Sequence, residues 1–442
     1  MSGSGHYTRL AAALFTAALL VFVINNPNAG RQATARVATI AASVEQTPLS
    51  AKLCAIGDPA FSGPFAPVDD VLSISPLGGV TAPGEVLPAP YLRINTKKGD
   101  TAFERRTTTA LAPARADIVA LERKIDRDAS GRATAQSWTV HFRSCENISF
   151  YYDRIDRLSD ELLERAGGLA AFVELGGPDH IALETKVRVP ANEVIGETNG
   201  FDVGLHDLAA SPAALERPDR YRSNPYARAV ALDAPPSLLE AITLNTAQAR
   251  CALDYLPKEL QAEWSSKLGD SWGIRKAKGE NACRTALPAE PGAAQGAWFT
   301  DAAHNGATTK VSAIALANDS IDPNRLIFAL HGRLPSLTPA LVSMGPKMDE
   351  ERTAAAKDFL SVRAGDGRIN TPFSAVKNGG TYCYDRLRAN FVGPRINGVI
   401  LVQREGGSAP GALKIEARGD VLSCIDLEEP WAFTGNETTF YR

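Results

Sequence analysis

The sequence lacks several features that would assign it to a common functional class. Its 47 basic and 50 acidic residues nearly cancel, so there is no excess of positive charge for binding nucleic acid. It has no G-x-S-x-G elbow, phosphate-binding loop or dinucleotide fingerprint, and no internal repeat. These absences argue against nucleic-acid binding and nucleotide chemistry, and we expect no cofactor.

Long hydrophobic runs are also missing, except near the N-terminus. Residues 10–24 are apolar apart from Thr16, and Arg9 precedes them. This length is typical of the hydrophobic part of a signal peptide and is short for a membrane span. Because no A-x-A cleavage site follows, an uncleaved membrane anchor is favoured over a cleaved signal. Both alternatives predict that the rest of the protein lies outside the cytoplasm.

The six cysteines are widely spaced and form no CxxC pair. Metal sites usually have short cysteine spacings, whereas an even, scattered set in an exported chain is typical of disulfides. We expect Cys251 to pair with Cys283 and Cys383 to pair with Cys424. The alternative is that all six are buried free thiols in a reducing compartment.

A chain of 442 residues with 44% hydrophobic content is long enough for two domains. Short runs of β-forming residues between turns occur both before residue 210 and after residue 295, with helical spacing between them. The predicted class is therefore mainly β, or α+β overall. The expected parts are an anchor or signal peptide (1–25), a flexible tether (26–70), a first antiparallel β domain (71–210), a helical connector (211–294) and a second small β barrel or sandwich (295–442).

Three segments of the first β domain occur in an order known from one enzyme family. They are Tyr91-Leu-Arg-Ile-Asn95, then residues 138–155, then residues 187–207. In order and spacing they resemble the β-rich core of the lysostaphin-type (LytM-like) zinc endopeptidases, which cut peptidoglycan cross-links. The resemblance covers roughly residues 75–210, and it implies an antiparallel fold of that type.

The resemblance also implies that the zinc ligands of the family have been replaced. Tyr91 and Asn95 stand where the family has the histidine and aspartate of an H-x-x-x-D element. Gly200 and Asp202 stand at the two histidines of its H-x-H strand, and Arg154 stands at a further histidine beside the metal. Zinc needs neutral imidazole or carboxylate ligands, and arginine stays protonated near neutral pH. The family mechanism is therefore expected to be lost.

The former cleft remains a candidate binding surface for an envelope protein or a cell-wall glycan or peptide. Its expected lining is Tyr91, Arg93, Asn95, Tyr152, Arg154 and Asp202. We expect Arg154 to pair with Asp202, so that a guanidinium replaces the metal cation. An inert packed remnant is the alternative for this surface.

Two competing functions remain open from the sequence. One is an active envelope hydrolase with a rearranged metal site, for which Asp202, His206 and His141 are the candidate ligands. Asp202 and His206 are four residues apart on a predicted strand, about 13 Å, which is too far for one ion. The other is a cargo-binding module in the C-terminal domain. The favoured prediction is a non-catalytic envelope protein with a binding, scaffolding or regulatory role.

Overall fold

The computed structural model describes most of the chain after residue 60. The described residues are 54, 60–80, 88–99, 104–212, 222–223, 236–242, 244–278, 282–283, 292–302, 313–331, 359–391, 393, 395–406 and 411–442. The predicted anchor or signal peptide lies outside them. Within the described ranges, no helix is both long enough and apolar enough to span a bilayer.

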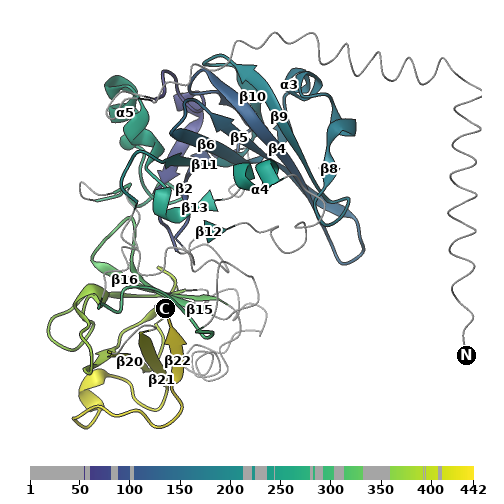
Figure 1. The fold of residues 1–442 in the computed structure, drawn as a ribbon. Helices are drawn as coiled ribbons and strands as arrows, with labels where there is room; N and C mark the ends of the chain where they lie inside the picture. The colour runs from purple at the N-terminus through teal and green to yellow at the C-terminus, as the bar shows by residue number, and fades with distance from the viewer. Residues whose placement is uncertain are drawn as a thin grey trace, which may run out of the picture. The chain divides into compact units, whose positions relative to one another are not determined.

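Antiparallel sheets dominate the structure, which confirms the predicted mainly β class (Figure 1). An eight-stranded sheet comes first. Its strands, in spatial order, are β1 (Val71–Ser75), β2 (Tyr91–Thr96), β11 (Gly200–Asp207), β6 (Ile148–Ile155), β5 (Ala133–Arg143), β4 (Ala116–Arg127), β9 (His180–Val189) and β8 (Val173–Glu174). A three-stranded sheet accompanies it, made of β3 (Thr108–Leu111), β10 (Val194–Thr198) and β7 (Arg157–Leu158).

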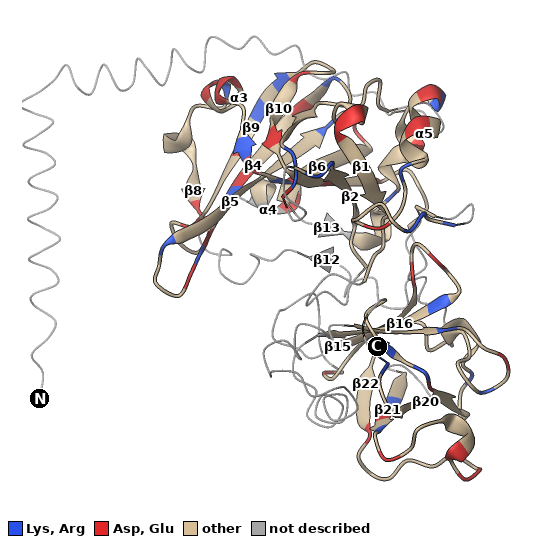
Figure 2. Ribbon diagram, turned by 180° about the vertical axis from the view of Figure 1, so that it is seen from behind, with Lys and Arg blue, Asp and Glu red and all other residues tan. Residues whose placement is uncertain are grey.

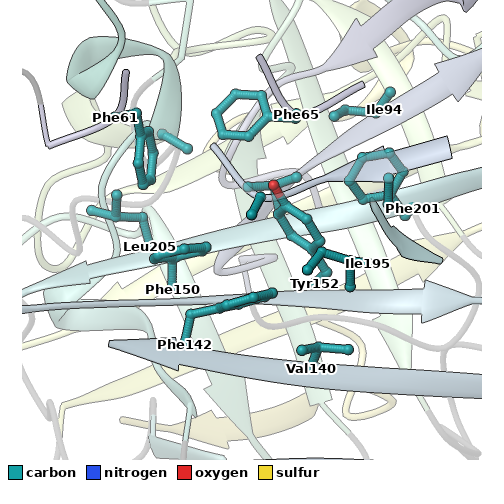
Figure 3. Packing of buried hydrophobic residues seen from close by; sticks show 14 of the residues in the cluster. Phe61, Phe65, Ile94, Val140, Phe142, Phe150, Tyr152, Ile195, Phe201 and Leu205 are labelled. Carbon is teal, nitrogen blue, oxygen red and sulfur yellow. The ribbon is translucent and has the colours of Figure 1, made fainter. Parts of the chain in front are cut away.

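One face of the eight-stranded sheet forms the main core of this region. Phe142 and Phe150, from neighbouring strands, stack with ring centroids 4.5 Å apart, and Tyr152 meets Phe201 at 5.0 Å. Ile195 of β10 packs in the same cluster (Figure 3). Because strand residues alternate between faces, burial of this set leaves the intervening residues of β2, β11 and β6 on the opposite face.

Short helices flank the strands. They are η1 (Val68–Asp70), α3 (Asp160–Arg165), η2 (Leu169–Ala171), α4 (Pro236–Ile242), η4 (Thr246–Gln248), η5 (Ala252–Tyr255) and α5 (Lys258–Ser265). In α3, the Ser159 side chain accepts a hydrogen bond from the backbone of Leu162, and acidic residues fill the first turn (Figure 2). Helices α4 and α5 lie within the segment predicted as a helical connector, residues 211–294.

The C-terminal part contains a nine-stranded antiparallel sheet. Its order is β18 (Thr381–Tyr384), β20 (Val399–Glu405), β21 (Ala412–Arg418), β22 (Thr438–Tyr441), β14 (Gly296–Phe299), β15 (Ala313–Asn318), β16 (Arg325–His331), β17 (Phe359–Arg363) and β19 (Arg388–Ala389). Helices η6 (Phe373–Ala375) and η7 (Cys424–Asp426) and the two-stranded β12 (Arg222–Ser223) and β13 (Leu244–Asn245) complete the described elements. Aromatic side chains fill its core, where Phe328 meets Phe373 at 4.9 Å and Tyr384 at 5.1 Å.

Three disulfides cross-link the protein. Cys251–Cys283 and Cys383–Cys424 are the two pairs named from the sequence, and Cys54–Cys145 is the third. Every cysteine is paired, which leaves none for the free-thiol alternative. Disulfides persist in oxidising compartments, so this set is consistent with a location outside the cytoplasm.

Gly196 allows β10 to run close to β7 in the three-stranded sheet. A Cβ at this position would overlap the carbonyl oxygen of Arg157 and lie 2.7 Å from Cγ2 of Ile155. We therefore expect Gly196→Ala to lower the free energy of unfolding by about 2 kcal/mol, measured by urea denaturation. Gly79→Ala is the matched control, because its nearest neighbour would be 4.0 Å away. Equal stability of the two variants would contradict this account.

Candidate functional site

Strands β2 and β11 place four of the predicted cleft residues on one face of the eight-stranded sheet. In the register between them, Gly200 lies opposite Asn95, Asp202 opposite Arg93, and Gly204 opposite Tyr91. This is the face turned away from the aromatic core. Two segments that are distant in the sequence thus meet, and we call this surface the polar face.

An ion pair between Arg93 and Asp202 lies at the centre of the polar face. Nε and Nη2 of the guanidinium donate to the two carboxylate oxygens at 2.6 and 2.9 Å. Asp202 is buried and Arg93 is about one-third exposed. Burial raises the pKa of Asp202 to about 6, although the bonds from Arg93 lower it. At neutral pH the carboxylate is therefore ionised and held by the guanidinium.

The sequence-based expectation that Arg154 pairs with Asp202 is wrong. Tyr152 lies opposite Val140 and Ile155 opposite Trp138, so two residues of β6 bulge against one residue of β5. Arg154 sits in this bulge with a φ of 67° and an exposed side chain. The hydrogen bonds to the carboxylate come from Arg93 instead, and Arg154 acts on it only through its charge, which lowers the pKa of Asp202.

Tyr152 also lies elsewhere than predicted. It is fully buried among the core aromatics, and its hydroxyl donates to the carbonyl of Leu111 at 2.7 Å (Figure 3). Its neighbour Tyr151 lies on the polar face instead, packed against Gly204, where a Cβ would overlap its ring. Tyr152 therefore stabilises the core, and Tyr151, although only 3% exposed, is the member of this pair that lies on the polar face.

Tyr91 and Asn95 lie on either side of Arg93 along β2. The Arg93 guanidinium is 5.6 Å from the centre of the half-exposed Tyr91 ring. Asn95 is buried, and its amide donates to Oγ of Ser75 at 3.1 Å on β1. Tyr91 is accessible to a ligand, whereas Asn95 mainly joins two strands.

Gly200 has a backbone conformation that excludes a metal-binding side chain. Its φ is +141°, and a Cβ would lie 3.1 Å from the carbonyl oxygen of Ile94. Residues with side chains rarely adopt such angles. A histidine at position 200 would therefore be strained. In the resembled family this position is expected to hold a zinc-ligand histidine.

The polar face continues onto β6, β5 and β4 through residues that, apart from His141, the sequence did not indicate. The Oγ1 of Thr139 donates to Oδ1 of Asp153 at 2.7 Å, and Nε2 of His141 bonds Oε1 of Glu122 at 2.6 Å. Asp153 lies opposite Asp202 in register. Thr139, Asp153 and Glu122 carry no motif, so only strand pairing reveals that they extend this surface.

The three candidate metal ligands do not converge on one point. His141 is bonded to Glu122, Asp202 is bonded to Arg93, and the Tyr151 ring lies 5.9 Å from the His141 ring and 6.0 Å from the His206 ring. Burial and the neighbouring His141 lower the pKa of His206 to about 4. Within the described ranges, no group of three His, Cys, Asp or Glu residues is placed to hold a metal ion.

Helix α4 covers the polar face over β4 and β9, several strands away from β2 in the sheet. The helix lies beside β4 (Figure 1), and its Leu238 and Ile242 belong to one buried cluster with Ala120 of β4 and Ala182 of β9. The Oγ of Ser237 donates to Oε2 of Glu184 at 2.6 Å. The part of the face around Tyr91, Arg93 and Asp153 is only half-buried. A ligand would therefore reach the sheet at β2, β11 and β6.

Comparison with known proteins gives no relative. No family model, curated protein or solved structure matches the chain. The similarity to lysostaphin-type peptidases therefore rests on residue pattern alone and stays a hypothesis.

Proposed function

We propose that this is an extracytoplasmic protein of the cell envelope that uses a lysostaphin-like β domain for binding or scaffolding instead of hydrolysis. The observation that carries the proposal is the Arg93–Asp202 pair on β2 and β11. In the resembled family these two strands hold the metal. Here a guanidinium supplies the positive charge, and it can neither activate water nor act as a base near neutral pH.

Two further observations support a non-catalytic site. The backbone at Gly200 disfavours the histidine that the family needs there. Both oxygens of Asp202, the remaining potential ligand, accept hydrogen bonds from Arg93. A metal would have to displace a buried ion pair in order to bind this carboxylate.

The half-buried groups of the polar face suit a polar ligand. Tyr91 offers an aromatic surface, Arg93 a cation and Asp153 a carboxylate. This combination can bind a cell-wall glycan or peptide, or a loop of another envelope protein. The disulfides support the location. The membrane anchor within residues 1–25 remains part of the proposal.

The proposal is tested by the zinc content of the full chain, produced in an oxidising compartment without a histidine tag. We expect elemental mass spectrometry to find zinc far below one equivalent per chain, both before and after incubation with zinc and dialysis. We also expect the metal-free protein to sediment with purified cell-wall material and to release no soluble fragments from it.

A stoichiometric zinc ion that is lost in Asp202→Ala would overturn the proposal and establish the rearranged hydrolase. The ion retained in Asp202→Ala would indicate a metal site that does not use Asp202 and would leave the reasoning on Arg93 intact. Release of fragments by the metal-free protein would equally contradict a binding role.

A further inference from the structure

The turn between Asp270 and Arg275 exposes two large apolar side chains. Trp272 is 44% exposed and Ile274 is 80% exposed. The turn is well ordered, because Oδ1 of Asp270 accepts backbone hydrogen bonds from Trp272 at 3.2 Å and from Ile274 at 2.9 Å. Gly273, which lies between them, has a φ of +69°, an angle that glycine adopts in turns without steric cost. The local backbone thus holds both side chains in solvent.

Cations surround this apolar turn. The ammonium of Lys98 lies 5.6 Å from the centre of the Trp272 ring, and the guanidinium of Arg105 lies 5.0 Å from it. Arg105 also donates to the carbonyl of Ser271 at 2.7 Å. Lys98 and Arg105 face each other across an isolated antiparallel bridge. The chain segment after β2 therefore joins the turn through charged side chains.

Further cations extend the same surface. Lys97, Arg106 and Lys276 are exposed, and the Arg106 backbone bonds the carbonyl of Lys97 at 2.9 Å. Burial lowers the pKa of Lys267, and the charges of Lys97 and Lys276 add to the shift, whereas those of Glu263 and Asp69 oppose it. These cations gather in a chain whose net charge is −3. Among the neighbouring carboxylates, Asp270 is bonded to the turn and pairs with Arg275 at 3.4 Å.

We propose that the Trp272–Ile274 turn and its surrounding lysines and arginines form a docking surface for a lipid bilayer with anionic headgroups. Tryptophan favours the headgroup region, an exposed isoleucine gains by entering the acyl layer, and lysine and arginine bind anionic lipids. A soluble polyanion would use the cations but would leave Ile274 in water. The turn is joined to β1, where Oγ of Ser73, opposite Asn95 in register, donates to the carbonyl of Asp270 at 2.7 Å. The proposal uses neither Arg93 nor Asp202, so it does not depend on the proposed function.

Trp272 provides its own reporter. The other four tryptophans, Trp138, Trp264, Trp298 and Trp431, are buried. We would mix the full chain with vesicles of phosphatidylcholine, with or without phosphatidylglycerol, whose acyl chains are brominated. With the anionic vesicles we expect quenched tryptophan emission, weakened by salt. Trp272→Phe should remove the quenched component. The predicted N-terminal anchor can hold the protein on either vesicle. The quantity measured is therefore the ratio of quenched to unquenched emission from Trp272.

Charge variants test the role of the cations. Each of Lys97→Gln, Lys98→Gln and Lys276→Gln should lower that ratio about fivefold. The matched control is Lys124→Gln with Arg132→Gln, which removes two exposed cations from the β4–β5 hairpin (Figure 2). Equal quenching with and without phosphatidylglycerol, or no effect of the lysine variants, would overturn the proposal. A blue shift of Trp272 with soluble polyphosphate as large as that with anionic vesicles would overturn it in favour of a polyanion site.

Discussion

Arg93→Ala is expected to lower the free energy of unfolding by about 3 kcal/mol near neutral pH, because it leaves the buried carboxylate of Asp202 without its partner. Asp202 is almost wholly buried, whereas Arg93 is 31% exposed, which places the effect at the lower end for a broken buried pair. Urea denaturation followed by circular dichroism measures the loss. The double variant Arg93→Ala with Asp202→Asn should regain much of it, since a neutral amide is easier to bury than a charge.

The sign of the pH dependence follows from the pKa of Asp202. The folded-state value of about 6 exceeds the reference value of 3.8. The folded protein therefore binds more protons than the unfolded chain between these values, and this group lowers stability as pH rises through that window, by about 3 kcal/mol. Without Arg93 the pKa should rise further, so the loss in Arg93→Ala should shrink as pH falls toward 5. A loss that is equal at pH 5 and pH 8, and equal in the double variant, would sink this explanation.

The strands could be predicted from sequence because their core-facing residues are mostly large and apolar. The faces were harder to assign in β6, where Phe150, Tyr151 and Tyr152 are all buried. Alternation therefore could not tell which tyrosine faces the core. The bulge that exposes Arg154 depends on pairing with β5 and leaves no mark in the sequence of β6.

The partner of Asp202 was missed for a related reason. Arg93 and Asp202 are 109 residues apart, and their contact depends on the register between β2 and β11. A shift of one residue would move every side chain of a strand to the other face. Residue types led us to expect an arginine beside Asp202, but only the register decides which arginine it is. The exclusion of a side chain at Gly200 is equally a product of strand pairing, since the atom nearest to an added Cβ, the carbonyl oxygen of Ile94, belongs to β2.

Removing the Cys54–Cys145 disulfide should have the second large effect, a loss of about 4–5 kcal/mol in the free energy of unfolding. The two cysteines are 91 residues apart, so the cross-link restricts a long loop of the unfolded chain. It also joins Cys54 to the turn between β5 and β6, where the Cys54 backbone donates to Oδ1 of Asn147 at 2.9 Å. Cys54→Ser with Cys145→Ser, followed by urea denaturation, measures the loss.

The pair Cys251–Cys283 is the matched control, because it spans only 32 residues and its cysteines are also largely buried. Loop entropy predicts that removing it costs about 1 kcal/mol less than removing Cys54–Cys145. If removing Cys251–Cys283 costs as much or more, local packing determines how much these disulfides stabilise the fold, rather than restriction of the unfolded chain. The predicted order instead makes Cys54–Cys145 the bond that most stabilises the sheet bearing Arg93 and Asp202. Folding of the polar face would then depend most strongly on export to an oxidising compartment.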